Sequence, residues 1–283
     1  MNIGVSGASG KLGKAVVAKL ANHASGHRIV AISRTPPTVS GGDEARLGDY
    51  DRPETLTVAY DGLDRLLLIP TSDLRPGRRA AQNVAAIDAA VNAGVKHVVF
   101  LSGAGTRTVE EPHIWASYYA AEQRLIKTAP AWSLLRMNYY AESLADEAKA
   151  SLGHGAITGL GENRVAFVSR NDIAAAAAGL LTGEGHEGAI YNLTGPQSLS
   201  GAERADVISE VTGKPLAFAV LPEETLRVGL AGAGLPTEVV DTVISIQKTF
   251  LTGGYDIVTG DIEHLSGRKP RSLEDVLTGL LPA

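Results

Sequence analysis

Residues 5–16 read VSGASGKLGKAV and place Gly7, Gly10 and Gly13 at spacings of three, directly after the apolar opening MNIGV. Glycines between a strand and a helix let the chain approach a phosphate closely, and the amide groups at the helix start can then bind it. Residues 2–6 form a short apolar run and residues 11–22 show a helical pattern, so both flanks are present. The stretch therefore predicts a dinucleotide-binding loop.

Two other loop types contain similar glycines. The P-loop of nucleoside triphosphatases needs a glycine, four further residues and then Gly-Lys-Ser/Thr. Here Ala8 occupies the place of the first glycine and Ala15 that of the magnesium-binding hydroxyl, which excludes this motif. A turn whose glycines serve only steric needs is the remaining alternative, and the flanking strand and helix disfavour it.

The first half of the chain alternates short β-branched runs with alanine-rich helical patterns, which is typical of βαβ units. The strands predicted from these runs are residues 2–6, 28–33, 64–69, 97–102 and 133–137, with a weaker one at 45–47. The predicted helices are residues 11–22, 53–60, 78–93 and 115–128. This pattern predicts an α/β fold with a doubly wound parallel Rossmann sheet.

The alternation of strand and helix patterns ends at about residue 150, after which helical patterns predominate. Strands are expected at residues 165–168 and 189–193, and helices at 172–181 and 201–212. We expect residues 1–150 to form an NADP-binding Rossmann domain. Residues 151–283 are expected to form mainly a smaller, helix-rich C-terminal substrate domain, although strand 189–193 can return to the main sheet. A substrate cleft is expected where the two domains meet.

The amino-acid composition limits the kinds of ligand and partner that the protein is expected to bind. The 283 residues carry a formal charge of -5, which gives no reason to expect nucleic acid, and no apolar segment is long enough for a membrane span. The absence of cysteine excludes thiolate metal sites, and the histidines supply no set of three ligands, so no metal is expected. We expect a cytoplasmic protein with a small-molecule substrate, and a homodimer is compatible with these observations.

The second predicted strand indicates which dinucleotide binds. An acidic residue about 20 positions after the glycine loop binds the ribose 2′-hydroxyl of NAD, whereas an arginine accommodates the 2′-phosphate of NADP. Arg34 stands at this distance from Gly13, directly after strand 28–33, and no acidic residue competes for the place. The sequence therefore predicts NADPH as cofactor, the alternative being an arginine that is merely solvated at a strand end.

Two further loops follow predicted strands at the edge where ligands of open α/β sheets bind. Residues 70–72 follow the strand 64–69, and Ser102 ends the strand 97–102. We expect both to contact the cofactor rather than to form ordinary turns. Three arginines crowd beside the first loop, and phosphate contact and a solvated helix start explain them equally well: Arg75, Arg78 and Arg79.

Several stretches together resemble the NmrA-like atypical short-chain dehydrogenases, and within these the NADPH-dependent quinone oxidoreductases and triphenylmethane dye reductases. They are residues 7–13, 32–34, 48–50, 96–99, 134–142, 169–172, 184–188 and 191–193. The resemblance covers most of the chain, is weakest after residue 220 and implies a flavin-free reductase. With the loops above, it gives these predicted cofactor-binding residues: Gly7, Ala8, Ser9, Gly10, Lys11, Leu12, Arg34, Asp49, Pro70, Thr71, Ser72, Ser102, Met137, Asn138, Tyr139 and Tyr140.

The usual catalytic pair of short-chain dehydrogenases is missing. Orthodox members use Tyr-x-x-x-Lys, in which the lysine activates the phenol as a proton donor. Here Glu122 stands four residues after Tyr118, and a carboxylate cannot act as that lysine does. The resemblance implies that Tyr118 and Glu122 occupy the corresponding positions of quinone reductases that also lack the pair. Tyr118, Glu122 and Tyr139 are the predicted catalytic residues, with His113 as an alternative donor.

The missing pair favours an easily reduced acceptor. A quinone takes up hydride to give a hydroquinone anion that water can protonate, so the protein must mainly hold the acceptor against the cofactor. The aromatic residues Trp115, Tyr118, Tyr139 and Tyr140 suit a flat acceptor, although core packing explains them equally well. We expect an NADPH-dependent reductase of quinones or similar conjugated, electron-poor acceptors. The alternatives are an NADP-sensing regulator without catalysis and a reductase of imines, enones or dyes.

Overall fold

The opening strand, β1 (Asn2–Ser6), lies inside a seven-stranded sheet of the computed structural model, which describes residues 1–23, 26–36, 41–110 and 113–282. The other strands of the sheet are β2 (Arg28–Ser33), β3 (Glu44–Leu47), β4 (Arg65–Leu68), β5 (His97–Gly103), β6 (Trp132–Met137) and β9 (Ala189–Leu193). Their order is β3-β2-β1-β4-β5-β6-β9, and β1 pairs in parallel with both β2 and β4. This order confirms the predicted doubly wound Rossmann sheet.

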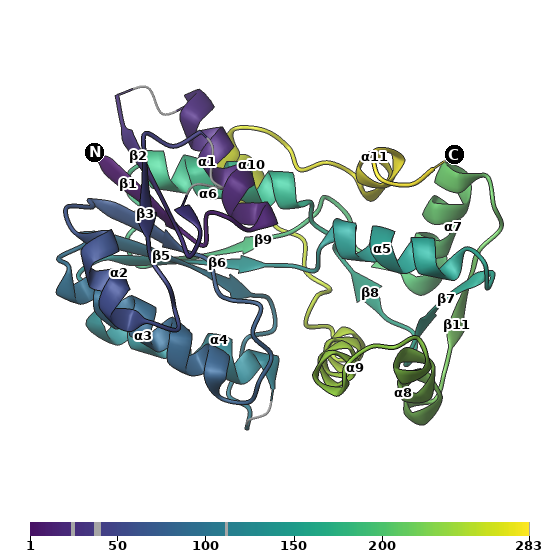
Figure 1. The fold of residues 1–283 in the computed structure, drawn as a ribbon. Helices are drawn as coiled ribbons and strands as arrows, with labels where there is room; N and C mark the ends of the chain where they lie inside the picture. The colour runs from purple at the N-terminus through teal and green to yellow at the C-terminus, as the bar shows by residue number, and fades with distance from the viewer. Residues whose placement is uncertain (24–25, 37–40, 111–112, 283) are drawn as a thin grey trace. The chain divides into compact units, whose positions relative to one another are not determined.

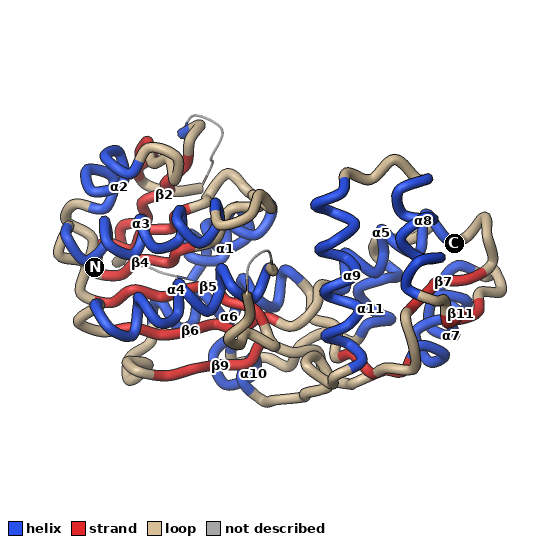
Figure 2. The backbone as a smooth tube through the Cα atoms, turned by 90° about the horizontal axis from the view of Figure 1, so that it is seen from below, coloured by secondary structure: helices blue, strands red, loops and turns tan. Residues whose placement is uncertain are grey.

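Helices cover both faces of this sheet. One face carries α2 (Pro53–Tyr60), α3 (Arg78–Asn92) and α4 (Ile114–Thr128), and the other carries α1 (Lys11–His23), α6 (Arg170–Thr182) and α10 (Asp261–Ser266), as Figure 1 shows and as Figure 2 shows from the side of α3 and α4. Every residue of β4 and β5 is buried, as expected for strands between two helical layers. The carboxyl ends of β1 to β6 consequently meet at one edge of the sheet.

The chain divides into two compact units whose boundaries differ from residue 150. The first unit contains residues 1–137, 171–192 and 261–268, and the second contains residues 138–170, 193–260 and 269–283. Strand 189–193 does return to the main sheet, as β9. The strand expected at 165–168 is shorter than predicted, because only Arg164–Val165 pairs as a strand while Val168 makes an isolated bridge to Tyr140.

The second unit combines short strands with helices. Its elements are α5 (Ala141–Ser151), β7 (Ala156–Gly159), β8 (Arg164–Val165), β10 (Leu199–Ser200), α7 (Gly201–Thr212), β11 (Ala217–Val220), α8 (Glu223–Gly232), α9 (Thr237–Leu251) and α11 (Leu273–Thr278). β11 runs parallel to β7, and β10 runs antiparallel to β8. A capping box of Ser200 and Glu203 begins α7, and Leu226 of α8 packs with Val240 and Ile244 of α9 in a small core. The unit is helix-rich, as predicted.

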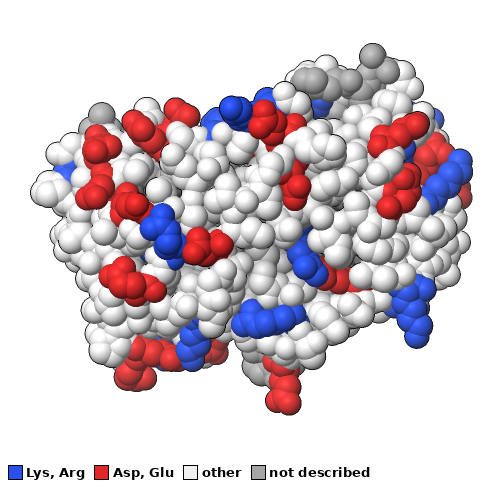
Figure 3. All heavy atoms as spheres, turned by 180° about the vertical axis from the view of Figure 1, so that it is seen from behind, with Lys and Arg blue, Asp and Glu red and all other residues white. Residues whose placement is uncertain are grey.

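The described residues contain neither a membrane-spanning helix nor a cluster of metal-ligating side chains. None of the helices described has the length and apolar character needed to cross a bilayer. Within the same residues, no three histidine or acidic side chains are grouped so that they could hold a metal ion. Figure 3 shows one face of the molecule, on which acidic and basic side chains are interspersed.

Candidate cofactor and active site

The glycine loop has the geometry that a close phosphate contact needs. Gly7 adopts a φ of +88°, and its amide donates to the carbonyl of Ile32 in β2 at 3.0 Å. A Cβ on Gly13 would lie 2.3 Å from the Gly7 carbonyl oxygen and 2.7 Å from the Ala8 Cα, so only glycine fits there. The loop therefore folds back on itself, and the first turn of α1, at Lys11 and Leu12, has amide groups of the kind that a helix start offers to an anion.

Arg34 lies where the sequence places it. It directly follows β2, the strand that pairs with β1, and its side chain is exposed. Within the ranges that the structure describes, no ion pair engages its guanidinium, whereas several other arginines at this edge are paired with carboxylates. Arg34 thus offers an available cation beside the glycine loop, as a 2′-phosphate requires.

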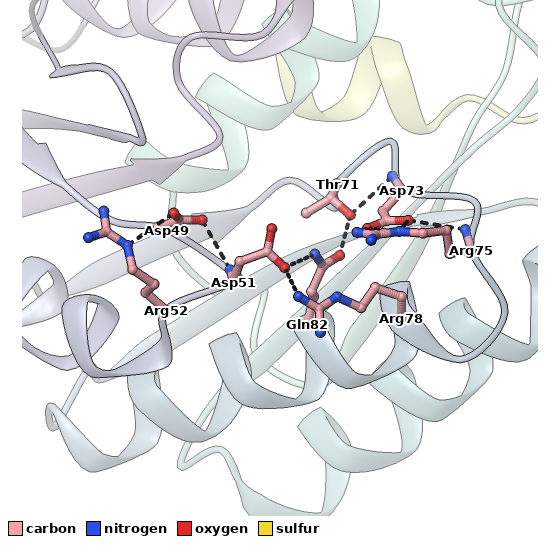
Figure 4. A network of polar contacts seen from close by, with 8 residues as sticks. All are labelled: Asp49, Asp51, Arg52, Thr71, Asp73, Arg75, Arg78 and Gln82. Atoms are coloured by element: carbon pink, nitrogen blue, oxygen red, sulfur yellow. Dashed lines mark hydrogen bonds and ion pairs between the residues drawn. The ribbon is translucent and has the colours of Figure 1, made fainter.

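The loops after β3 and β4 are joined by a network of polar contacts, shown in Figure 4. Thr71 Oγ1 donates to Gln82 Oε1 at 2.6 Å, and Gln82 Nε2 donates to Asp51 Oδ1 at 2.8 Å. The carboxylate of Asp49 accepts from the amide of Asp51 at 3.0 Å and from Arg52 Nε at 3.3 Å. Asp49 and Thr71, both predicted cofactor contacts, therefore lie in one connected system at the carboxyl edge of the sheet.

The three arginines beside the loop after β4 are all engaged by the protein. Arg75 pairs with Asp73, and Arg78 Nη2 lies 2.5 Å from Asp51 Oδ1. The guanidinium of Arg75 holds the pKa of Asp73 down to about 2. Arg79 points instead to Tyr118 and donates from Nη2 to its hydroxyl oxygen at 2.7 Å. Of the two explanations left open by the sequence, these pairings favour a helix start over phosphate contact.

Ser102 and Glu122 form a buried polar cluster with Arg136, which lies in β6. Ser102 Oγ donates to Glu122 Oε1 at 2.6 Å, and Arg136 donates to both oxygens of the same carboxylate at 2.9 and 2.6 Å. This pairing raises the pKa of Arg136, and Glu122 is only 1 % exposed. Because both carboxylate oxygens are occupied, the geometry suits Glu122 to tying α4 to the sheet rather than to proton transfer.

Tyr118 is packed inside the first unit. Its side chain is 2 % exposed, lies against the rings of Phe100 and Trp115, and has the guanidinium of Arg79 at 4.5 Å from its ring centre. Burial of this kind argues against the predicted catalytic role, since a donor must reach the reacting group. His113, the alternative donor, caps α4 by accepting from the amide of Trp115 at 3.2 Å.

The remaining predicted residues lie around the end of β6. Met137 ends β6 in the first unit, and its carbonyl accepts from the Ala104 amide at 2.8 Å. Asn138, Tyr139 and Tyr140 belong to the second unit. The Asn138 side chain is buried and bonds to the carbonyl of Tyr255 and the amide of Tyr139, which gives it a structural role there.

Tyr139 lies in an aromatic cluster of the second unit. The ring centre of Phe250 is 5.2 Å away, that of Phe167 is 6.0 Å away and that of Tyr255 is 6.1 Å away. Burial, with a smaller contribution from the negative charge of Glu147, raises the pKa of Tyr139 to about 12. The phenol is therefore neutral at physiological pH and can serve as a hydrogen-bond donor. The Arg170 guanidinium lies over the ring of Tyr140, with its central carbon 5.2 Å from the ring centre.

Sequence reasoning missed Gln82 and the role of Arg136. Gln82 is 5 % exposed on α3, and a buried amide on an alanine-rich helix indicates a specific partner. Arg136 interrupts an apolar strand, where a charge needs a counter-charge. Of these two signals, only the charge within the apolar strand can be read from the sequence, because the burial of Gln82 is known from the structure, and it does not name the partner of Arg136.

The parallel sheet, the folded-back glycine loop and the cation after β2 together define a Rossmann-type dinucleotide-binding protein. A family model described as NAD(P)H-binding matches residues 7–184, and the chain belongs to this family. It is an NAD(P)H-dependent oxidoreductase, as its relatives are.

Three relatives illustrate the range of the family. Quinone oxidoreductase 2 of Escherichia coli (strain K12) is 30% identical, and the match covers 98% of each chain. NAD(P)H azoreductase of Xenophilus azovorans is 30% identical over 83% of this chain and 81% of its own length. The crystal structure of Citrobacter sp. triphenylmethane reductase complexed with NADP(H) is 31% identical with a TM-score of 0.89, over 99% of this chain and 100% of that one.

Proposed function

We propose that the protein is an NADPH-dependent reductase that transfers hydride to quinones or similar conjugated, electron-poor acceptors without a flavin. The cofactor supplies the hydride, and the chain supplies the binding site for the cofactor. The relatives that act on quinones, azo compounds and triphenylmethane dyes support this range of flat acceptors. In the proposal the first unit binds NADPH.

The observation that carries the proposal is the pairing of the glycine loop with Arg34. Gly13 packs so tightly on Gly7 that the start of α1 is held next to the end of β1, where a diphosphate fits. Arg34 follows the neighbouring strand with its guanidinium exposed, so it suits the additional phosphate of NADP. In this proposal the cofactor-binding site includes residues 7–12, Asp49, residues 70–72 and Met137.

Water supplies the final proton in this mechanism. Tyr118 is buried against Arg79, and both oxygens of Glu122 are occupied by Arg136 and Ser102. A quinone needs no strong acid, because the hydroquinone anion formed by hydride transfer is protonated readily by solvent. Tyr139 remains a predicted catalytic residue in this proposal, with a neutral phenol and an aromatic ring that suits a flat acceptor.

A panel of acceptors tests the function directly. The purified protein is mixed with NADPH and a series of benzoquinones, naphthoquinones, azo dyes and triphenylmethane dyes, and loss of the reduced-nicotinamide absorbance is followed. Turnover with quinones, without added flavin and without flavin absorbance in the protein, is the expected result. Turnover only with dyes, imines or enones would move the substrate assignment, and tight NADPH binding without any turnover would identify an NADP-sensing regulator.

Assembly and location complete the proposal. We propose a homodimer in the cytoplasm. Sedimentation velocity of the purified chain tests the assembly, and a single species with the mass of one chain at micromolar concentration would reject it. Fractionation of cells that express the tagged chain tests the location.

A further inference from the structure

Gln82 joins the loops after β3 and β4 through its side chain, as Figure 4 shows. It projects from the second turn of α3 and is 5 % exposed. Its amide oxygen accepts from Thr71 and its amide nitrogen donates to Asp51, so both ends of the amide are used. A buried amide that is satisfied at both ends fixes the relative positions of its two partners.

The contact with Gln82 also decides what Thr71 can offer a ligand. A hydroxyl has a single proton, and Thr71 donates it to Gln82 Oε1. The Asp73 amide donates to the same hydroxyl oxygen at 3.3 Å. What remains on Thr71 is a lone pair, which accepts from a donor such as a ribose hydroxyl and cannot donate to a phosphate oxygen.

Asp51 holds the other end of the amide through its charge. Hydrogen bonds from Gln82 and from the Arg78 guanidinium keep the pKa of Asp51 below its ordinary value, so the acceptor is a carboxylate. A hydrogen bond to a carboxylate is stronger than one between neutral groups. The orientation of the amide is therefore imposed: nitrogen toward Asp51, oxygen toward Thr71.

We propose that Gln82 is a positioning residue for the cofactor, which sets Thr71 as an acceptor for a hydroxyl group of NADPH by anchoring its amide on Asp51. This inference rests on the proposed cofactor-binding site. It predicts that the amide can be replaced only by a group that accepts from Thr71 and is itself satisfied at position 51.

A charge-swap experiment tests it. Q82E places a second carboxylate against Asp51, and we expect NADPH to bind about 10- to 100-fold more weakly, as for an unpaired buried polar group. The double variant Q82E/D51N restores both contacts at unchanged net charge. The new amide at position 51 can donate to one glutamate oxygen, while the other oxygen accepts from Thr71. We expect the double variant to bind NADPH within about threefold of the wild type.

Three further variants complete the set. D51N alone removes the charge that fixes the amide orientation and should weaken NADPH binding, but by less than Q82E because the new amide oxygen at position 51 still accepts from the Gln82 nitrogen. Gln82→Met removes both contacts without adding charge and should weaken binding about tenfold. The exposed Gln123 of α4 provides the matched control, Gln123→Glu, which should change nothing. NADPH dissociation constants are measured by calorimetry, alongside KM for NADPH, kcat and the melting temperature without ligand.

The inference predicts a change in the dissociation constant and in KM for NADPH, with kcat at saturating cofactor held within about threefold. It is overturned if Q82E binds NADPH as the wild type does, or if Q82E/D51N binds no better than Q82E. Should Q82E fail to fold, the comparison of Gln82→Met with Q82E/D51N decides, and equal affinities for the two would reject the inference. A wild-type protein that does not bind NADPH would instead reject the proposed function.

Discussion

At the scale of single residues, the chemistry at the sheet edge depends on which charges are already paired. Arg34 is exposed and has no ion pair among the described residues, whereas Arg75 and Arg78 are neutralised by Asp73 and Asp51. A cation that forms no internal ion pair can bind a phosphate without breaking an existing contact. We therefore expect Arg34 to discriminate between the two dinucleotides.

Replacing Arg34 by glutamate should weaken NADPH binding by at least about tenfold and leave NADH binding nearly unchanged, since only NADPH carries the 2′-phosphate that the new carboxylate repels. Dissociation constants for both cofactors are compared by calorimetry. Lys127→Glu, at an exposed position of α4, controls for the change in net charge. Equal losses for the two cofactors would contradict the assignment.

Replacing Tyr118 by phenylalanine separates packing from proton transfer. The phenol is buried and accepts a hydrogen bond from Arg79, so the variant should lose about 1–3 kcal/mol of stability by leaving the guanidinium short of a partner. We expect kcat with benzoquinone to stay within about fivefold, because the loss of a general acid costs roughly 10²- to 10⁴-fold. Steady-state kinetics below the melting temperature distinguish a packing role from a role in proton transfer. A hundredfold loss of kcat would identify Tyr118 as the general acid.

At the scale of elements, buried ionisable groups connect helices to one another and to the strands. Arg136 of β6 and Glu122 of α4 form such a connection in the first unit. In the second unit, Glu147 of α5 lies near the buried Arg204 of α7, which donates to Asn163 at 2.8 Å. Burial raises the pKa of Glu147 from 4.5 to about 7, so this carboxyl titrates close to neutrality.

This raised pKa predicts how stability depends on pH. A carboxyl that binds its proton more tightly when folded contributes stability that is fully present below pH 4.5 and is lost as the pH rises through about 7. Glu147→Gln should therefore gain on the order of 1–3 kcal/mol over the wild type at about pH 8 and little at about pH 4.5. Urea denaturation at both pH values measures this, with the exposed Glu210→Gln of α7 as control. A variant that is less stable at the higher pH would refute the argument.

At the scale of the whole molecule, the first unit is built from three separate stretches of chain. Helix α6 and strand β9 come from residues 171–192, and α10 comes from residues 261–268. Arg268 pairs with the fully buried Asp172 at 2.8 Å, and a Cβ on Gly179 would lie 1.8 Å from the Leu265 carbonyl oxygen. The late stretches are thus integral to the sheet's second helical layer.

A fragment of residues 1–150 should consequently fail to fold cooperatively. It would expose the sheet face that α6 covers with eight buried residues, and it would lack the edge strand β9. Circular dichroism during thermal denaturation, compared with the full chain, provides the measurement. A sharp melting transition for the fragment would show that the N-terminal stretch is an independent domain.

The sequence by itself determined the strand–loop–helix of residues 2–22, the alternation of parallel strands with helices and the cation at position 34. These features depend on local spacing: apolar runs, glycines that permit close contact, and the distance along the chain from one loop to the next strand. Helix α5 and the strand pair β7–β11 were not predicted from the sequence, because short segments with mixed periodicity carry weak local signals.

Only the tertiary structure decided which polar groups meet. Thr71, Gln82 and Asp51 come from three separate segments, Tyr118 is buried by Arg79 of another helix, and Glu122 finds Arg136 on a strand. A side chain's hydrogen-bond partner is selected by packing in three dimensions, whereas its residue type records only that a partner is needed. That is why the glycine loop could be predicted from spacing, whereas the partners of Tyr118 and Glu122 on α4 could not.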